Sequence, residues 1–278
     1  MADGLTLGTA GAWLRRRAPE CVLACLAVLV FLGFLGSVNL WGKREQRASA
    51  EAIDTIHKDH WLVAQIQGRP RLEKPPLPRW TIASVMWITG VESEWTVRLP
   101  SACAGLGMVA LVYAFGLRLG GRTLALLSAS ILISMVFFIL EMRQAGNDGP
   151  LAFFTTLAMY SALRCLEGDR SSRFWARWMW VALGLGFLCK GPIIVLIVAV
   201  AVVPALVLQG RLRSHLALLL DGWGLLAFLV LALSWPVPVL LRDPEAIRVW
   251  YLEMAQKAGS AGVQNQHSRE ILALNWPS

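Results

Sequence analysis

The chain has 278 residues, of which 56% are hydrophobic and only 16% are charged, and its mean hydropathy is +0.55. This composition lies far from that of a soluble domain and is typical of a protein embedded in a lipid bilayer. The net charge of +8 does not indicate a nucleic-acid partner, because the basic residues form short clusters beside hydrophobic segments, where they report orientation and contact with anionic lipid or phosphate.

The first membrane span is expected at 21–42, an uncharged stretch that follows Arg15, Arg16 and Arg17. About 20 apolar residues are enough for a helix to cross the hydrocarbon core. A cleaved signal peptide is the rival interpretation, but this apolar run is longer than the core of such a signal and no small-residue cleavage site follows it. Because basic residues gather on the cytoplasmic side of membrane helices, the N-terminus is predicted to be cytoplasmic.

The placement of charge along the rest of the chain indicates seven spans. An apolar run at 80–91 would be only about 18 Å long at about 1.5 Å per residue, so it is expected to lie at the membrane interface. With this segment left out, the arginines within 118–122, 164–177 and 211–213 fall in alternate short loops, as the positive-inside rule requires. The predicted spans are 21–42, 99–117, 123–140, 149–163, 178–189, 191–210 and 222–241.

The predicted fold is therefore all-α, a polytopic helical membrane protein that forms a single membrane domain over 1–278. A multi-pass protein of the plasma (inner) membrane is expected, with interfacial helices in a first external loop, 41–97, and an external C-terminal tail, 242–278. The first loop is rich in Lys and Arg, which the positive-inside rule disfavours in a translocated segment. Either a loop this long is less bound by the rule or it holds an anionic substrate, and the sequence leaves both open.

A charged pair in the first loop is followed directly by prolines. Glu73 and Lys74 precede Pro75, Pro76 and Pro78, which fix the entry into the helix expected at 80–91. A cation held rigidly beside a carboxylate suits a phosphate clamp or a metal ligand. A flexible loop is the plainer alternative.

Two further ionisable residues are predicted at the external ends of apolar helices. Asp148 precedes Gly149 and Pro150, and an ionisable residue at this depth is a functional candidate by default, although Asp before Gly-Pro is also a good helix cap. Lys190 occupies the tip of a hairpin that Gly191 and Pro192 make. Its ammonium needs an anion at the interface, and phosphate is the natural partner.

These segments, in this order, resemble the C-superfamily glycosyltransferases, and within them the aminoarabinose transferase and protein O-mannosyltransferase group that uses polyprenyl-phosphate sugars. The matching segments run through nearly the whole chain, whereas the relatives continue into a soluble external domain for which no counterpart is expected here. They are Asp59-His60-Trp61-Leu62-Val63, Glu73-Lys74-Pro75-Pro76, Arg98-Leu99-Pro100-Ser101, Asp148 with Leu151-Ala152-Phe153-Phe154, and Lys190-Gly191-Pro192.

The resemblance implies transfer of a sugar, with inversion, from a polyprenyl-phosphate donor to a lipid or protein acceptor on the outer face of the membrane. Arg47, Lys74 and Lys190 would contact the phosphate, and Asp148 would be an acidic residue of the site. Glu73 would be a metal or hydrogen-bond partner, and His267 in the external tail would complete a metal pair with it. A divalent metal is thus the one cofactor that the resemblance allows, and membrane lipids are the expected surroundings.

One departure from the family pattern concerns the general base. Aligned on Trp41 and Trp61, the position where the family carries an aspartate is Arg44, and a guanidinium cannot accept a proton. Either Glu45 has taken over, or Asp148 works alone, or the protein no longer transfers sugar. A non-catalytic membrane partner that binds a polyprenyl phosphate is therefore a second hypothesis. A transporter of lipid-linked sugars is a third, which the nearly uncharged spans disfavour.

Overall fold

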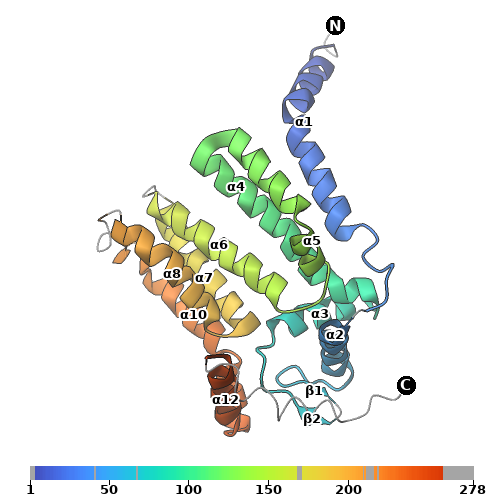
Figure 1. The fold of residues 1–278 in the computed structure, drawn as a ribbon, viewed down its shortest axis with the longest axis vertical. Coiled ribbons are helices and arrows are strands. Elements are labelled where there is room, and N and C mark those ends of the chain that lie inside the picture. Colours follow the sequence, from blue (N-terminus) through green and yellow to red (C-terminus); the bar gives the residue numbers. More distant parts are fainter. Residues whose placement is uncertain are drawn as a thin grey trace.

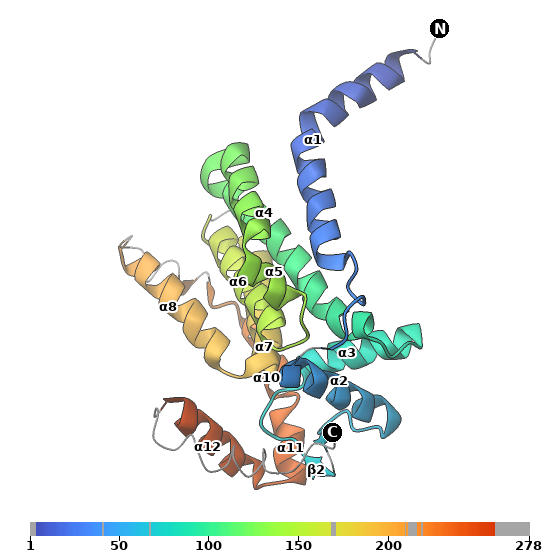
Figure 2. The same ribbon diagram turned by 45° about the vertical axis from the view of Figure 1, so that its right-hand side comes forward.

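The computed structural model describes residues 4–40, 42–66, 68–167, 171–208, 210, 216–217 and 219–258. Long helices run side by side through most of the molecule, and short helices gather with a small two-stranded sheet at one end (Figures 1 and 2). We refer to this end, which carries α2 (Gly42–His57) and α3 (Leu77–Thr89), as the loop end.

Seven helical arms in the described chain correspond to the seven predicted spans. Helix α4 (Glu94–Ser134) supplies two of them, because it folds back on itself at Gly120 and Gly121. Gly121 has a positive φ of 76°, which favours glycine. One arm is built from this helix and α5 together, and another from α10 and α11. The helices are α1 (Gly4–Leu32), α4 (Glu94–Ser134), α5 (Val136–Met142), α6 (Asp148–Leu166), α7 (Ser172–Lys190), α8 (Ile193–Leu208), α10 (Gly222–Leu233) and α11 (Pro236–Arg242).

In the described part of the chain, two stretches are by length and composition alone long and apolar enough to cross a membrane, Glu94–Ser134 and Gly222–Arg242. Helix α8 is a shorter apolar helix. The other arms carry charged residues near their ends, as Arg173 and Arg177 of α7 illustrate.

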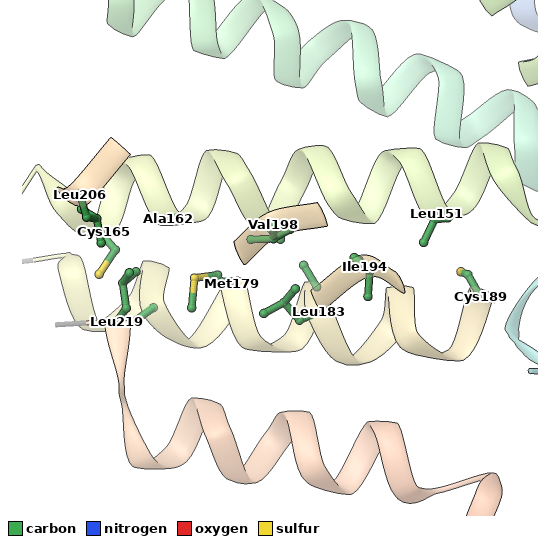
Figure 3. Packing of buried hydrophobic residues seen from close by; sticks show 13 residues of the cluster. Leu151, Ala162, Cys165, Met179, Leu183, Cys189, Ile194, Val198, Leu206 and Leu219 are labelled. Atoms are coloured by element: carbon green, nitrogen blue, oxygen red, sulfur yellow. The ribbon is translucent and has the colours of Figure 1, made fainter. Parts of the chain in front are cut away.

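Two clusters of buried side chains hold the arms together. The first joins α6, α7 and α8, where Leu151, Leu183 and Ile194 meet and small residues let the backbones approach closely (Figure 3). The second joins α1, α4 and α5 around Phe31, whose ring packs edge-on against Phe138 at 5.6 Å. The contact of α4 with α6 connects the two clusters.

The loop end contains the surface helices that the sequence predicts. Helix α2 buries one face against α3, including Ala52 and Thr55, and leaves Lys43 and Arg47 exposed. Helix α3 starts with Pro78 in its first turn and ends at Gly90, which has a φ of 67°. Strands β1 (Gln65–Ile66) and β2 (Arg69–Pro70) pair antiparallel, and α12 (Ala246–Ala258) follows α11.

Acidic residues bind the basic residues at the opposite end of the molecule. Glu20 of α1 accepts from Arg122 at 2.7 and 2.8 Å, beside the turn of α4. Asp221 caps α10 by accepting from the backbone N–H of Gly224 at 2.9 Å, and it also pairs with Arg177 of α7 at 3.1 Å. These pairs fix the arms at the end away from the candidate site.

Candidate functional site

Four charged side chains from four helices form one chain of ion pairs at the loop end, which we call the charged cluster. Arg44 donates from Nη2 to Glu141 Oε2 at 2.9 Å and from Nη1 to Asp148 Oδ2 at 3.3 Å. Lys190 Nζ donates to the other oxygen of Asp148, Oδ1. Charges therefore alternate along the cluster, and each carboxylate lies next to a cation.

The ends of four helices place these residues. Arg44 lies in the first turn of α2, Glu141 in the last turn of α5, Asp148 at the start of α6 and Lys190 at the end of α7. The Gly191 that follows has a φ of 76°, which lets the chain turn sharply into α8. Asp148 does not cap its own helix, as one interpretation of the sequence proposed, because its two oxygens contact Arg44 and Lys190.

The loop between α5 and α6 is held on both sides. Arg143 donates to the carbonyl oxygens of Val30, Gly33 and Phe34 at the end of α1, with 2.9 Å to Gly33. These carbonyls lack partners within their own helix, so the Arg143 side chain caps the C-terminal end of α1. Asn147 donates to the carbonyl of Cys189 at 3.2 Å and so ties the loop to the tip that carries Lys190.

Glu45 does not belong to the charged cluster, although it is adjacent to Arg44. Its side chain is only 1% exposed, and its two oxygens accept from Arg98 Nε and Nη2 at 2.8 and 2.9 Å. It also accepts from the backbone N–H of Ala145 at 3.2 Å. A carboxylate enclosed in this way has no oxygen turned toward a substrate, which argues against the expected role of Glu45 as the base.

A pocket of about 230 Å³ lies next to the charged cluster. Lys74 and Lys190 both line it, as does Glu73, and Trp235 and Trp250 form an apolar wall. The wall is fixed in place, because the Trp235 and Trp250 indole N–H groups donate to loop carbonyls at 2.7 Å each. Two of the three predicted phosphate ligands are thus brought together, and Lys190 belongs to both the pocket and the cluster.

The segment that leads to Glu73 and Lys74 is anchored rather than flexible. Arg79, at the start of α3, donates to the carbonyls of Trp61 and Leu62 at 2.8 and 3.3 Å. Burial lowers the Arg79 pKa to about 10, against the opposing effect of Glu51 and Asp54. The backbone that carries Lys74 is therefore held in place where this side chain lines the pocket.

The third predicted phosphate ligand, Arg47, lies elsewhere. It is exposed on α2, and the residues that line the pocket do not include it. Its charge acts on Glu51, whose pKa is raised by burial although Arg71, Arg79 and Arg47 oppose the rise. Glu51 pairs with Arg71 at 2.5 Å.

One feature of Glu73 suits a metal or a hydrogen-bond donor. Its Oε2 is buried and has no hydrogen-bond partner in the described chain. His267, the residue expected to complete a metal pair, lies outside the described residues. Among the residues that the structure describes, no group of three metal-ligating side chains is found.

Comparisons with known proteins identify the family of the chain. The model of the dolichyl-phosphate-mannose-protein mannosyltransferase family matches residues 73–240, which include Glu73, Lys74, Asp148 and Lys190. The chain belongs to this family. The resemblance inferred from the sequence motifs is thereby confirmed.

Relatives at lower identity extend the match over most of the chain. The undecaprenyl phosphate-alpha-4-amino-4-deoxy-L-arabinose arabinosyl transferase of Yersinia pestis (strain Pestoides F) is 24% identical over 257 residues, which are 91% of this chain and 46% of that protein. A transferase of the same description from Sodalis glossinidius is 25% identical over 264 residues, or 92% of this chain and 45% of that protein. The chain spans about half the length of the curated relatives that it matches.

Solved structures show the same fold. ArnT from Cupriavidus metallidurans bound to undecaprenyl phosphate superimposes with a TM-score of 0.78 at 21% identity, over 84% of this chain and 44% of that one. The apo structure of the same protein gives a TM-score of 0.71 at 23% identity, over 87% and 44%. The predictions of a polytopic helical fold and of a multi-pass membrane protein are confirmed.

Sequence reasoning missed three residues that build the site: Arg98, Arg143 and Glu141. Arg98 and Arg143 were not assigned a role because their partners are carbonyls and a carboxylate that lie far along the chain. Glu141 follows the apolar run 123–140 directly, and an ionisable residue at the end of a span is the signal that could have identified it.

Proposed function

We propose that this chain is a membrane glycosyltransferase, which moves a sugar from a polyprenyl-phosphate-linked donor to a lipid or protein acceptor. The observation that carries the proposal is the pocket in which Lys74 and Lys190 meet, directly beside the charged cluster. Membership of a family of polyprenyl-phosphate-sugar transferases supports it. The names of the relatives favour undecaprenyl phosphate as the lipid carrier.

The two lysines suit the phosphate of such a donor. The polyprenyl phosphate that leaves such a donor gains negative charge as its bond to the sugar breaks, and cations held in a partly apolar pocket stabilise that charge strongly. Asp148 orients the Lys190 ammonium from the cluster side. The tryptophan wall offers an apolar surface to the sugar or the first prenyl units.

The proposed reaction takes place on the outer face of the membrane, with the N-terminus cytoplasmic. The basic residues at the far end of the arms, among them Arg118, Arg122 and Arg177, support this orientation through the positive-inside rule.

A divalent metal held by Glu73 stays part of the proposal, supported by the buried oxygen that lacks a partner.

The second candidate is a non-catalytic protein that binds a polyprenyl phosphate. Arg44 favours it, because a guanidinium lies where the family has a base and pairs with the carboxylates around it. The hydrogen bond to Glu141 raises the Arg44 pKa above its ordinary value against the opposing effect of burial, and the charges of Glu141 and Asp148 also raise it. Arg44 is therefore a permanent cation.

Turnover by the purified full chain in detergent tests the two candidates. Undecaprenyl-phosphate aminoarabinose is supplied with a bacterial lipid extract, and the release of undecaprenyl phosphate is followed by mass spectrometry.

Lys74→Ala and Lys190→Ala should weaken binding of undecaprenyl phosphate by about tenfold or more, since each removes a charge-assisted contact. Lys58→Ala, which removes an exposed external lysine, is the matched control and should bind as the wild type does. Binding without turnover would support the non-catalytic candidate, and unaltered binding in both lysine variants would contradict the assigned pocket.

A further inference from the structure

We infer that Glu141 is the residue that takes the proton from the acceptor, in place of the carboxylate that is missing at position 44. This inference rests on the proposed function and assigns a role in it to a residue that the sequence motifs did not indicate. It follows from how the carboxylates in and beside the charged cluster are occupied.

Three carboxylates come close to Arg44 or follow it in the chain, and in two of them both oxygens are paired with cations. Asp148 uses both of its oxygens, one on Arg44 and one on Lys190. Glu45 uses both of its oxygens on Arg98 and is almost wholly buried. A group whose lone pairs are already held by cations is poorly placed to accept a further proton.

Glu141 differs from both. Only its Oε2 is engaged, by Arg44 at 2.9 Å, and within the described chain its Oε1 has no hydrogen-bond partner. The side chain is 19% exposed, whereas that of Glu45 is 1% exposed, so Glu141 is not enclosed as Glu45 is. Glu141 is thus the carboxylate of the charged cluster with an oxygen available for proton transfer.

Arg44 acts as a positioning residue for Glu141. It holds one oxygen of Glu141, and the same Nη2 donates to Gln144 Oε1 at 3.4 Å, which restrains the end of α5. Its other branch contacts Asp148 at 3.3 Å, so it links Glu141 to the residue that orients Lys190. The base and the phosphate-binding cation are therefore held by one connected set of ion pairs.

The proposed transfer forms one bond and breaks one bond at the anomeric carbon of the sugar. The acceptor oxygen forms its bond to the anomeric carbon while its proton moves to Glu141 Oε1. The bond between the anomeric carbon and the phosphate oxygen breaks, and its electron pair leaves with the polyprenyl phosphate. Lys74 and Lys190 meet the charge that appears there.

The experiment compares Glu141→Gln with Asp148→Asn in the transfer assay on the purified full chain. Glu141→Gln keeps the shape and the Arg44 contact but removes the base, so kcat should fall by at least 100-fold while the donor KM and the binding of undecaprenyl phosphate stay within about threefold of wild type. Asp148→Asn releases Lys190 and should raise the donor KM. Glu92→Gln, an external carboxylate that pairs with His57, is the control and should behave as wild type.

The pH profile adds a measurement that a structural role would not change. Turnover by the wild type should fall on the acidic side as the base becomes protonated, and the residual activity of Glu141→Gln should lack that acidic limb. Wild-type transfer that survives in Glu141→Gln at more than half its rate overturns the role of Glu141 and leaves the proposed function standing. Absence of transfer by the wild type overturns both.

Discussion

The pair of Glu45 and Arg98 shows how single residues hold α2 to the neighbouring helical arms. Arg98, at the start of α4, binds both oxygens of Glu45 on α2 and also the carbonyls of Leu35, Val38 and Asn39 after α1. The side chains of Arg98 and Glu45 are 8% and 1% exposed. Glu45 further accepts from the loop before α6, so three separate segments meet at one carboxylate.

Replacing Glu45 by alanine should therefore affect stability. Glu45→Ala leaves the Arg98 guanidinium buried without its carboxylate, and breaking a buried pair from one side costs about 3–5 kcal/mol. The free energy of unfolding in detergent, measured with a denaturant, checks this. Arg118→Ala, which removes an exposed partner of Glu167, should cost at most about 1 kcal/mol. A loss of less than about 1 kcal/mol in Glu45→Ala would show that the pair does not hold the segments together.

At the scale of elements, the hairpin inside α4 depends on close backbone approach. A Cβ at Gly116 would lie 2.4 Å from Ala125 Cα, so the two arms touch through a residue without a side chain. Gly121 supplies the positive φ at the turn between them. The sequence predicted two apolar runs here, 99–117 and 123–140, and the structure joins them through one short turn.

Gly116→Ala should consequently push the two arms of α4 apart. An added methyl group that meets backbone atoms cannot be accommodated by rotating a side chain, and overpacking of this kind costs about 1–3 kcal/mol. Thermal unfolding in detergent measures the effect. Gly222→Ala is the matched control, because a Cβ there meets no atom within 4 Å, and it should unfold at the wild-type temperature or slightly above. Equal midpoints for the two variants would contradict the close approach.

At the scale of the whole molecule, the described features that the sequence predicts to be external lie at one end of the arms. Helices α2 and α3 belong to the loop end, whereas the turn of α4 belongs to the other end (Figures 1 and 2). The charged cluster and the pocket lie at the loop end, and the pair of Arg177 and Asp221 lies at the other. This arrangement agrees with an odd number of spans between the N-terminus and the site.

Labelling of single cysteines on intact cells tests the proposed orientation. The five native cysteines are replaced first, and Val91→Cys and Leu119→Cys are then introduced at positions that are 41% and 67% exposed. A membrane-impermeant maleimide should label position 91 on intact cells and position 119 only after lysis. The reverse pattern would place the candidate site on the cytoplasmic side.

The sequence by itself determined the arms, the surface helices and the family. Runs of apolar residues and the placement of arginines are sufficient for this, because the cost of burying charge in lipid acts on each segment separately. Lys74 and Lys190 could also be chosen as phosphate-binding candidates, since the prolines and glycine beside each one restrict the local backbone.

Only the tertiary structure decided which carboxylates are engaged and which cations share a pocket. Glu45 and Glu141 are both glutamates near the ends of helices, yet one is enclosed by Arg98 and the other keeps an oxygen available. Their partners lie 53 and 97 positions away along the chain. Such pairings depend on how helices from distant segments pack, and no local pattern encodes that packing.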